Sequence, residues 1–133
     1  MRLMTDKTAA PILIVDDDDH ARALARKTLR AAGYRVVEAK NGKAAIDMLM
    51  ADPASEPRLI LLDLEMPIMP GWEFLAIAES YTRLSRIPVV IVSGTEPQPE
   101  TLARRAVVAW VRKPCGPTEL AAIVAKHARG DSG

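Results

Sequence analysis

Four short, continuously apolar runs constrain the fold of this chain more than any other feature of its sequence. They cover residues 12–15, 59–62, 89–92 and 107–111, and charged residues or helix breakers bound them. Such runs are too short for helices and are typical of strands buried on both faces of a parallel sheet. A fifth run, residues 35–39, is more polar and carries charges, which indicates a strand at the edge of that sheet.

Amphipathic segments separate the apolar runs. In residues 21–32 apolar positions recur every three or four residues, and Gly33 supplies a stop. The opposite face of this helix carries a stripe of Arg22, Arg26 and Arg30, which we interpret as solvated. Asp18 and Asp19 lie just before the helix, where carboxylates stabilise its N-terminus.

The remaining helices are expected at residues 42–50, from Gly71 to about Tyr81, from about Pro99 to Ala106, and from Pro117 to Ala128. Trp72 and Phe74 are expected to pack into the core from the third helix. The order is therefore strand–helix, repeated five times. Because crossovers between parallel strands are right-handed, this order predicts helices on both faces of one sheet.

The predicted fold class is α/β, a single doubly wound (βα)5 domain with a five-stranded parallel sheet. We expect the flavodoxin-like strand order 2-1-3-4-5. A chain of 133 residues is the size of one domain. We expect a flexible leader at 1–10, the domain at 11–128 and a disordered tail at 129–133.

Composition excludes several classes of function. A net charge of +1 favours neither nucleic acid nor an acidic partner, and the single cysteine excludes a disulfide framework or a cysteine-based zinc cluster. No apolar run approaches the ~20 residues that span a bilayer, and the N-terminus lacks the apolar block of a secretory signal. We therefore expect a cytoplasmic protein that neither inserts into membranes nor binds nucleic acid directly.

Polar residues follow the apolar runs at the points where the strands should end. Asp16 and Asp17 follow the run at 12–15, and Asp63 follows the run at 59–62. Ser93 follows the run at 89–92, and Lys113 lies just after the run at 107–111. In a doubly wound sheet, ligands bind at the carboxyl ends of the strands. The topology thus brings carboxylates, a hydroxyl and an amine to one edge of the sheet.

The charge of this cluster restricts its chemistry. Two carboxylates ~4 Å apart repel by about 4 kcal/mol at an effective dielectric near 20, and one lysine does not neutralise three of them. Such a cluster takes up protons or holds a hard divalent cation such as Mg²⁺ or Mn²⁺. A carboxylate beside that cation can attack a phosphoryl group, while the cation and an ammonium offset the developing charge. The acids also argue against a flavin-phosphate site, because they would repel the phosphate.

Four motifs carry a family resemblance. They are ILIVDD at 12–17, LLDLEMPIMPG at 61–71, VVIVSG at 89–94 and VRKP at 111–114. In this order and at these intervals, they make the sequence similar to a response-regulator receiver domain, the CheY-like phosphoacceptor module of two-component signalling. The resemblance covers about residues 11–128.

The resemblance implies a role for each site residue. Asp63 is the phosphoacceptor, and Asp16 and Asp17 form an acidic pocket. Mg²⁺, or Mn²⁺, is held by Asp17, Asp63 and the backbone carbonyl of Glu65. Ser93 and Lys113 contact the phosphoryl group, and the Lys113–Pro114 peptide bond is expected to be cis. Trp110 occupies the position of the family's switch aromatic. Glu65 and Gly94 flank the site and are expected to set the lifetime of the phosphate.

The sequence departs from the family pattern in three places. Pro70 replaces a common acidic residue, residues 107–109 lack a usual glycine, and the segment between Ser93 and Lys113 is short. These departures leave the output face open. Trp110 is either a moving switch or an edge-strand aromatic that packs on the last helix. Cys115 is expected to fill a small site next to Pro114.

The function implied is a phosphorylation-controlled switch rather than an enzyme with an external substrate. A sensor histidine kinase or a phosphotransfer protein would phosphorylate Asp63, and an unknown downstream protein would read the altered surface. Two alternatives stay open. One is a metal-dependent phosphatase with an aspartyl nucleophile, weakly mimicked by Asp63-Leu64-Glu65. The other is a pseudo-receiver that only binds partners.

Overall fold

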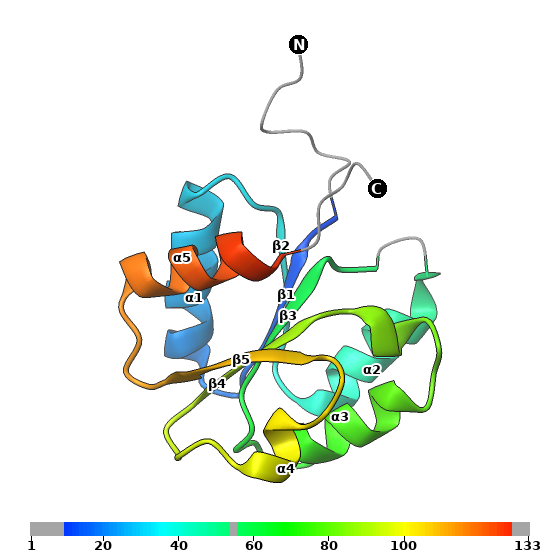
Figure 1. Ribbon diagram of the computed structural model, residues 1–133. Helices are drawn as coiled ribbons and strands as arrows, with labels where there is room; N and C mark the ends of the chain where they lie inside the picture. Colours follow the sequence, from blue (N-terminus) through cyan, green and yellow to red (C-terminus); the bar gives the residue numbers. More distant parts are fainter. Residues whose placement is uncertain (1–9, 54–55, 129–133) are drawn as a thin grey trace.

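The computed structural model describes residues 10–53 and 56–128 (Figure 1). Its centre is a five-stranded parallel sheet in the order β2-β1-β3-β4-β5, which confirms the predicted strand order. The strands are β1 Ile12–Val15, β2 Val36–Ala39, β3 Leu59–Leu62, β4 Val89–Ser93 and β5 Val107–Arg112. The expected tail, and the expected leader apart from Ala10, lie outside the described residues.

Helices cover both faces of this sheet. They are α1 Asp19–Ala31, α2 Gly42–Ala51, α3 Gly71–Glu79, a 3-10 turn η2 Leu84–Arg86, α4 Pro99–Leu102 and α5 Pro117–His127. Helices α1 and α5 lie on one face, whereas α2 and α3 lie on the other (Figure 1). The doubly wound α/β fold expected from the alternation of strands and helices is therefore confirmed. Within the described residues, no helix has the length and apolarity needed to cross a bilayer.

Each strand contributes side chains to two separate apolar cores, one on each face of the sheet. In β1, Ile12 and Ile14 belong to the core under α1 and α5, while Leu13 and Val15 belong to the core under α2 and α3. All residues of β1 and β3 are buried, which explains why their sequences are continuously apolar. Strand β2 lies at the edge and is only half-buried over most of its length, as its charged residues indicated.

The prediction for Trp72 is wrong. Trp72 is 57% exposed, whereas Phe74 on the same helix is fully buried. The buried positions of α3 are Gly71, Phe74, Leu75 and Ala78, which recur every three or four residues. Trp72 lies outside this stripe, so the helix cannot turn it toward the sheet.

Helix α4 is shorter than the predicted segment that ran to Ala106. It ends at Leu102, and residues 103–106 form turns before β5 begins. The register of β4 and β5 shifts between the pairs Val89↔Val107 and Val90↔Ala109, which leaves Val108 as an extra, 40% exposed residue. A bulge of this kind bends an edge strand and limits pairing there.

Candidate functional site

The candidate site lies where β1 and β3 end side by side. Val15 and Leu62 are register partners, so the next residues, Asp16 and Asp63, leave the sheet at the same edge. The backbone N–H of Asp63 donates to the Val15 carbonyl at 3.0 Å, and that of Asp16 donates to the Ala39 carbonyl at 3.2 Å. The sheet's own hydrogen bonds therefore fix both backbones.

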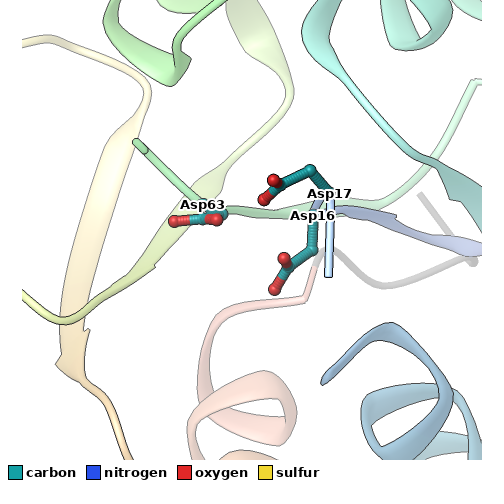
Figure 2. Close-up of side chains that lie close together, drawn as sticks. All are labelled: Asp16, Asp17 and Asp63. Atoms are coloured by element: carbon teal, nitrogen blue, oxygen red, sulfur yellow. The ribbon is translucent and has the colours of Figure 1, made fainter. Parts of the chain in front are cut away.

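Three acidic side chains converge at this edge. One carboxylate oxygen from each of Asp16, Asp17 and Asp63 lies within 4.8 Å of the other two, and Figure 2 shows the Asp17 carboxylate turned toward Asp63. Asp16 and Asp63 are buried, with 7% and 5% exposure, whereas Asp17 is exposed. The predicted topology implied that these acids meet at one edge of the sheet, and the structure brings them together there.

Local turns orient the acids. Asp16 Oδ1 accepts a hydrogen bond from the Asp18 N–H at 2.9 Å, and Asp63 Oδ1 accepts one from the Glu65 N–H at 3.2 Å. Asp18 caps α1, because its Oδ1 accepts from the N–H of His20 at 2.9 Å. The interpretation of Asp18 as a helix cap is thus confirmed.

Lys113 completes the cluster from the end of β5. Its Nζ lies 3.2 Å from Asp16 Oδ2 and 3.7 Å from Asp63 Oδ2. Its backbone N–H donates to the Ser93 carbonyl at 2.9 Å, and the Lys113–Pro114 peptide bond is cis. We name the set of Asp16, Asp17, Asp63 and Lys113 the carboxylate pocket.

Burial and charge shift the titration of this pocket. Burial raises the pKa of Asp63 to about 6; Asp16 and Asp17 push it up, while the Glu65 N–H and Lys113 pull it down. Burial lowers the pKa of Lys113, but the carboxylates of Asp16 and Asp63 raise it by more, so its net shift is upward. Asp63 therefore carries its negative charge at neutral pH at an electrostatic cost, which the neighbouring Lys113 ammonium offsets in part.

This donor set fits a hard divalent cation. All the convergent ligand atoms are carboxylate oxygens, the type that Mg²⁺ and Mn²⁺ prefer. Asp17 faces solvent, so a cation bound there could keep water ligands. Glu65 is exposed beside the pocket. Gly71 lets the loop between β3 and α3 pack closely against the backbone of Asp63, since a Cβ at that glycine would lie 2.6 Å from the Asp63 carbonyl oxygen.

Ser93 lies at the end of β4, but its hydroxyl is engaged elsewhere. The side chain is fully buried, and its Oγ lies 3.0 Å from Thr95 Oγ1 and accepts a hydrogen bond from the Thr95 N–H at 3.2 Å. Sequence reasoning missed Thr95. The only signal for it is a second hydroxyl two residues after the strand-end serine.

The β4–α4 loop, which we define as residues 94–98, is also held by β5. Trp110 Nε1 donates to the Thr95 carbonyl at 3.2 Å, and Arg112 Nη2 donates to the carbonyl of the exposed Gly94 at 3.3 Å. Trp110 packs against the core under α2 and α3. The alternative that it packs on the last helix is therefore wrong, because its neighbours Ala109 and Val111 face α5.

Cys115 lines an apolar groove of about 470 Å³ between α1 and α5, which reaches Asp16 and Lys113 at one end. Burial, together with Glu119, raises the pKa of the Cys115 thiol to about 11. The thiol is therefore protonated and unreactive at neutral pH.

Residues 12–125 match the family described as the response regulator receiver domain. The chain belongs to this family. Among curated relatives, the two-component response regulator ORR5 of Oryza sativa subsp. japonica is 37% identical over 90 residues, which are 67% of this chain and 66% of that protein. The sensor histidine kinase CheAY of Helicobacter pylori is 34% identical over 83 residues, or 62% of this chain and 10% of the kinase.

Solved receiver structures have the same fold. The chemotaxis protein CheY4 of Vibrio cholerae superposes with a TM-score of 0.78 at 26% identity, covering 90% of this chain and 98% of CheY4. The Mn²⁺-bound form of response regulator Rcp1 gives a TM-score of 0.74 at 26% identity, covering 87% of this chain and 92% of Rcp1. The receiver domain thus accounts for nearly all of the described chain, but for less than two thirds of the first curated relatives.

Proposed function

We propose that this receiver domain is a phosphorylation-controlled switch whose phosphoacceptor is Asp63. The observation that carries the proposal is the convergence of Asp16, Asp17 and Asp63 beside Lys113 at one sheet edge. A sensor histidine kinase or a histidine phosphotransfer protein would supply the phosphoryl group, and an unknown downstream protein would read the result. The similarity to the sensor kinase CheAY supports a partner of this class.

In this proposal the side chains of Asp17 and Asp63 and the backbone carbonyl of Glu65 hold Mg²⁺ or Mn²⁺. The carboxylate donor set and the Mn²⁺-bound form of Rcp1 support the assignment. A bound cation supplies positive charge that offsets the charge of the phosphoryl oxygens. Asp16 contributes to the acidic pocket while it accepts hydrogen bonds from Lys113 and the Asp18 N–H.

The chain's own residues divide the remaining work. The Asp63 carboxylate attacks phosphorus, so that a P–O bond forms as the P–N bond of the phosphohistidine donor breaks and the imidazole leaves. The Lys113 ammonium, already 3.7 Å from Asp63 Oδ2, stabilises the negative charge on the transferred group. Glu65 and Gly94 border the site and are proposed to set the lifetime of the phosphate.

The switch would act through the β4–α4 loop. A phosphoryl group on Asp63 adds about −1.5 to −2 charges and strong acceptor oxygens. Ser93 would leave Thr95 to donate to one of these oxygens, and Trp110, bonded to the Thr95 carbonyl, would move with the loop. We propose that a protein partner in the cytoplasm, rather than nucleic acid, reads this change, and that residues 11–128 form the functional unit.

A labelling experiment tests the proposal. With Mg²⁺ and a small-molecule phosphodonor, the protein should gain one acid-labile phosphate, and the Asp63→Asn variant should gain none. Asp63→Asn is a matched control because Asn keeps an oxygen that can accept the Glu65 N–H bond. Labelling that persists unchanged in the variant, or release of phosphate from an added phosphoester, would contradict the assignment.

A further inference from the structure

Arg22 on α1 is engaged on all three of its guanidinium nitrogens. Nε donates to Glu38 Oε1 at 3.2 Å, Nη1 to the Asp16 carbonyl at 2.8 Å, and Nη2 to Asp19 Oδ1 at 2.6 Å. Its partners lie on β2, at the end of β1 and in the first turn of α1. The interpretation of the arginine stripe as solvated is wrong for Arg22, whose side chain is only 16% exposed.

The bond to the Asp16 carbonyl acts on the carboxylate pocket through the backbone. That carbonyl belongs to the peptide unit that joins Asp16 to Asp17, and a peptide unit is planar. Fixing its oxygen therefore restricts the torsions on either side, which set the directions in which the two side chains leave the chain. The N–H of Asp16 is already fixed by the Ala39 carbonyl, so Arg22 holds the opposite side of the residue.

Asp17 depends on this restraint more than Asp16 does. The Asp16 carboxylate has its own partners in the Asp18 N–H and Lys113. The Asp17 carboxylate has no hydrogen-bond or ion-pair partner in residues 10–53 and 56–128, and it is exposed. The backbone alone therefore aims it at Asp63.

Glu38 keeps Arg22 in place. Burial raises the pKa of Glu38, but Arg26 and Arg22 lower it by more, so the carboxylate stays charged. Arg26 pairs with the second oxygen of Glu38, with Nη1 2.7 Å from Oε2. This acid on β2 thus holds two of the three arginines of α1, Arg22 and Arg26, and of these two only Arg22 bonds to the β1–α1 turn.

We infer that Arg22 is a positioning residue of the cation site: it fixes the Asp16–Asp17 peptide so that both carboxylates face Asp63. The inference rests on the cation site of the proposed function but not on phosphorylation. A positioning role and a purely electrostatic effect of Arg22 predict opposite changes in metal affinity. Removing a cationic side chain near a metal site should tighten metal binding by relieving repulsion, whereas removing a positioning contact should weaken it.

The test is a Mg²⁺ titration of the full chain, without phosphodonor, by calorimetry and by intrinsic tryptophan fluorescence. Arg22→Met keeps the apolar stem but removes the charge and donors, and should weaken Mg²⁺ binding roughly tenfold, as for other groups that support metal ligands. Arg26→Met is the matched control, because it removes the same charge and a Glu38 pair but no contact to Asp16. It should change the affinity less than roughly twofold.

Arg22→Lys separates position from charge and covers the case in which Arg22→Met does not fold. Lysine keeps the charge, but one ammonium cannot match the three-way geometry of the guanidinium. We expect it to bind Mg²⁺ several-fold more weakly than the wild type, with Asp63 still labelled at saturating Mg²⁺. Affinity that is unchanged in Arg22→Lys, or unchanged or tighter in a folded Arg22→Met, would overturn the inference and leave the proposed function intact. Absence of Mg²⁺ binding by the wild type would instead count against the proposed cation site itself.

Discussion

The carboxylate pocket and the β4–α4 loop lie at the same edge of the sheet, but they are held in different ways. In the pocket, sheet hydrogen bonds fix the backbones of Asp16 and Asp63, whose side chains are buried. In the loop, side-chain bonds from Ser93, Trp110 and Arg112 do most of the holding, at 3.0–3.3 Å. A segment held mainly by exchangeable side-chain bonds opens at lower cost than one held by a buried sheet. The contrast supports the proposed division of roles, with the chemistry in the pocket and the readout in the loop.

The same glycine substitution in both regions should show the largest difference. A Cβ at Gly71 would lie 2.6 Å from the Asp63 carbonyl oxygen and 2.7 Å from the Leu64 Cα, whereas a Cβ at Gly94 meets nothing within 4 Å. Gly71→Ala should lower the free energy of unfolding by about 3 kcal/mol, because backbone must shift. Gly94→Ala should change it by less than about 0.5 kcal/mol. Urea denaturation of the two variants checks this, and equal effects would break the comparison.

Removing the buried charge of the pocket should stabilise the fold. The pKa of Asp63 is raised to about 6 by burial, so the folded state holds its proton more tightly than the unfolded state does. This group therefore lowers the stability as the pH rises from about 4 to about 6, and the penalty persists above that range. A rise of the Asp63 pKa from 3.8 to about 6 corresponds to about 3 kcal/mol, and screening by solvent reduces this value, so Asp63→Asn should add about 2 kcal/mol at pH 7.5.

The pH dependence sharpens this test. Unfolding free energies of the wild type and of Asp63→Asn should converge near pH 4, where Asp63 is protonated in the folded state, and separate toward pH 7. A constant difference across this range would show that the gain has another origin.

Removing one hydroxyl from the loop should have a smaller effect. Thr95→Val deletes the contact with Ser93 Oγ but keeps the backbone N–H bond to Ser93 and the carbonyl that accepts from Trp110. We expect a loss of about 0.5–1 kcal/mol, the net value of one hydrogen bond. Chemical denaturation measures it, and tryptophan emission should stay close to that of the wild type. A large shift in emission would mean that the Thr95 hydroxyl, and not its carbonyl, holds Trp110.

The smallest effect is expected at the rim of the loop. Arg112 and Glu96 form an ion pair at 3.1 Å, with side chains 48% and 85% exposed. Exposed pairs contribute little, so Arg112→Met should cost less than about 0.5 kcal/mol of global stability. Hydrogen exchange should nevertheless quicken at residues 94–96, because the bond to the Gly94 carbonyl is lost. Unchanged exchange would show that Arg112 does not hold the loop.

The sequence predicted the pocket better than the loop for a physical reason. The acids follow central strands that are apolar throughout, and parallel topology brings the carboxyl ends of such strands together whatever the details of packing. The sequence alone therefore places Asp16 and Asp63 together, and the same rule brings Lys113 to this edge from the end of β5. Their functional roles stay predictions from family resemblance.

The loop depends on details that local pattern does not encode. The bulge at Val108 changes the pairing of β5, and α4 is a single turn that gives way to turns at residues 103–106. The prediction that the arginine stripe is solvated was wrong for Arg22 for a related reason. One of the three partners of Arg22 is Glu38 on the edge strand β2, and the only sign of this pair in the sequence is a charged residue inside a predicted strand.

The end of β5 sends four successive residues to four different surroundings. Trp110 contacts one core, Val111 the other, Arg112 the β4–α4 loop and Lys113 the buried acids. Gaining or losing a single residue here would change all four assignments at once, because it would place Arg112 or Pro114 where the Lys113 ammonium belongs. A substitution in this segment therefore alters one contact at a time, whereas a change in its length alters all four.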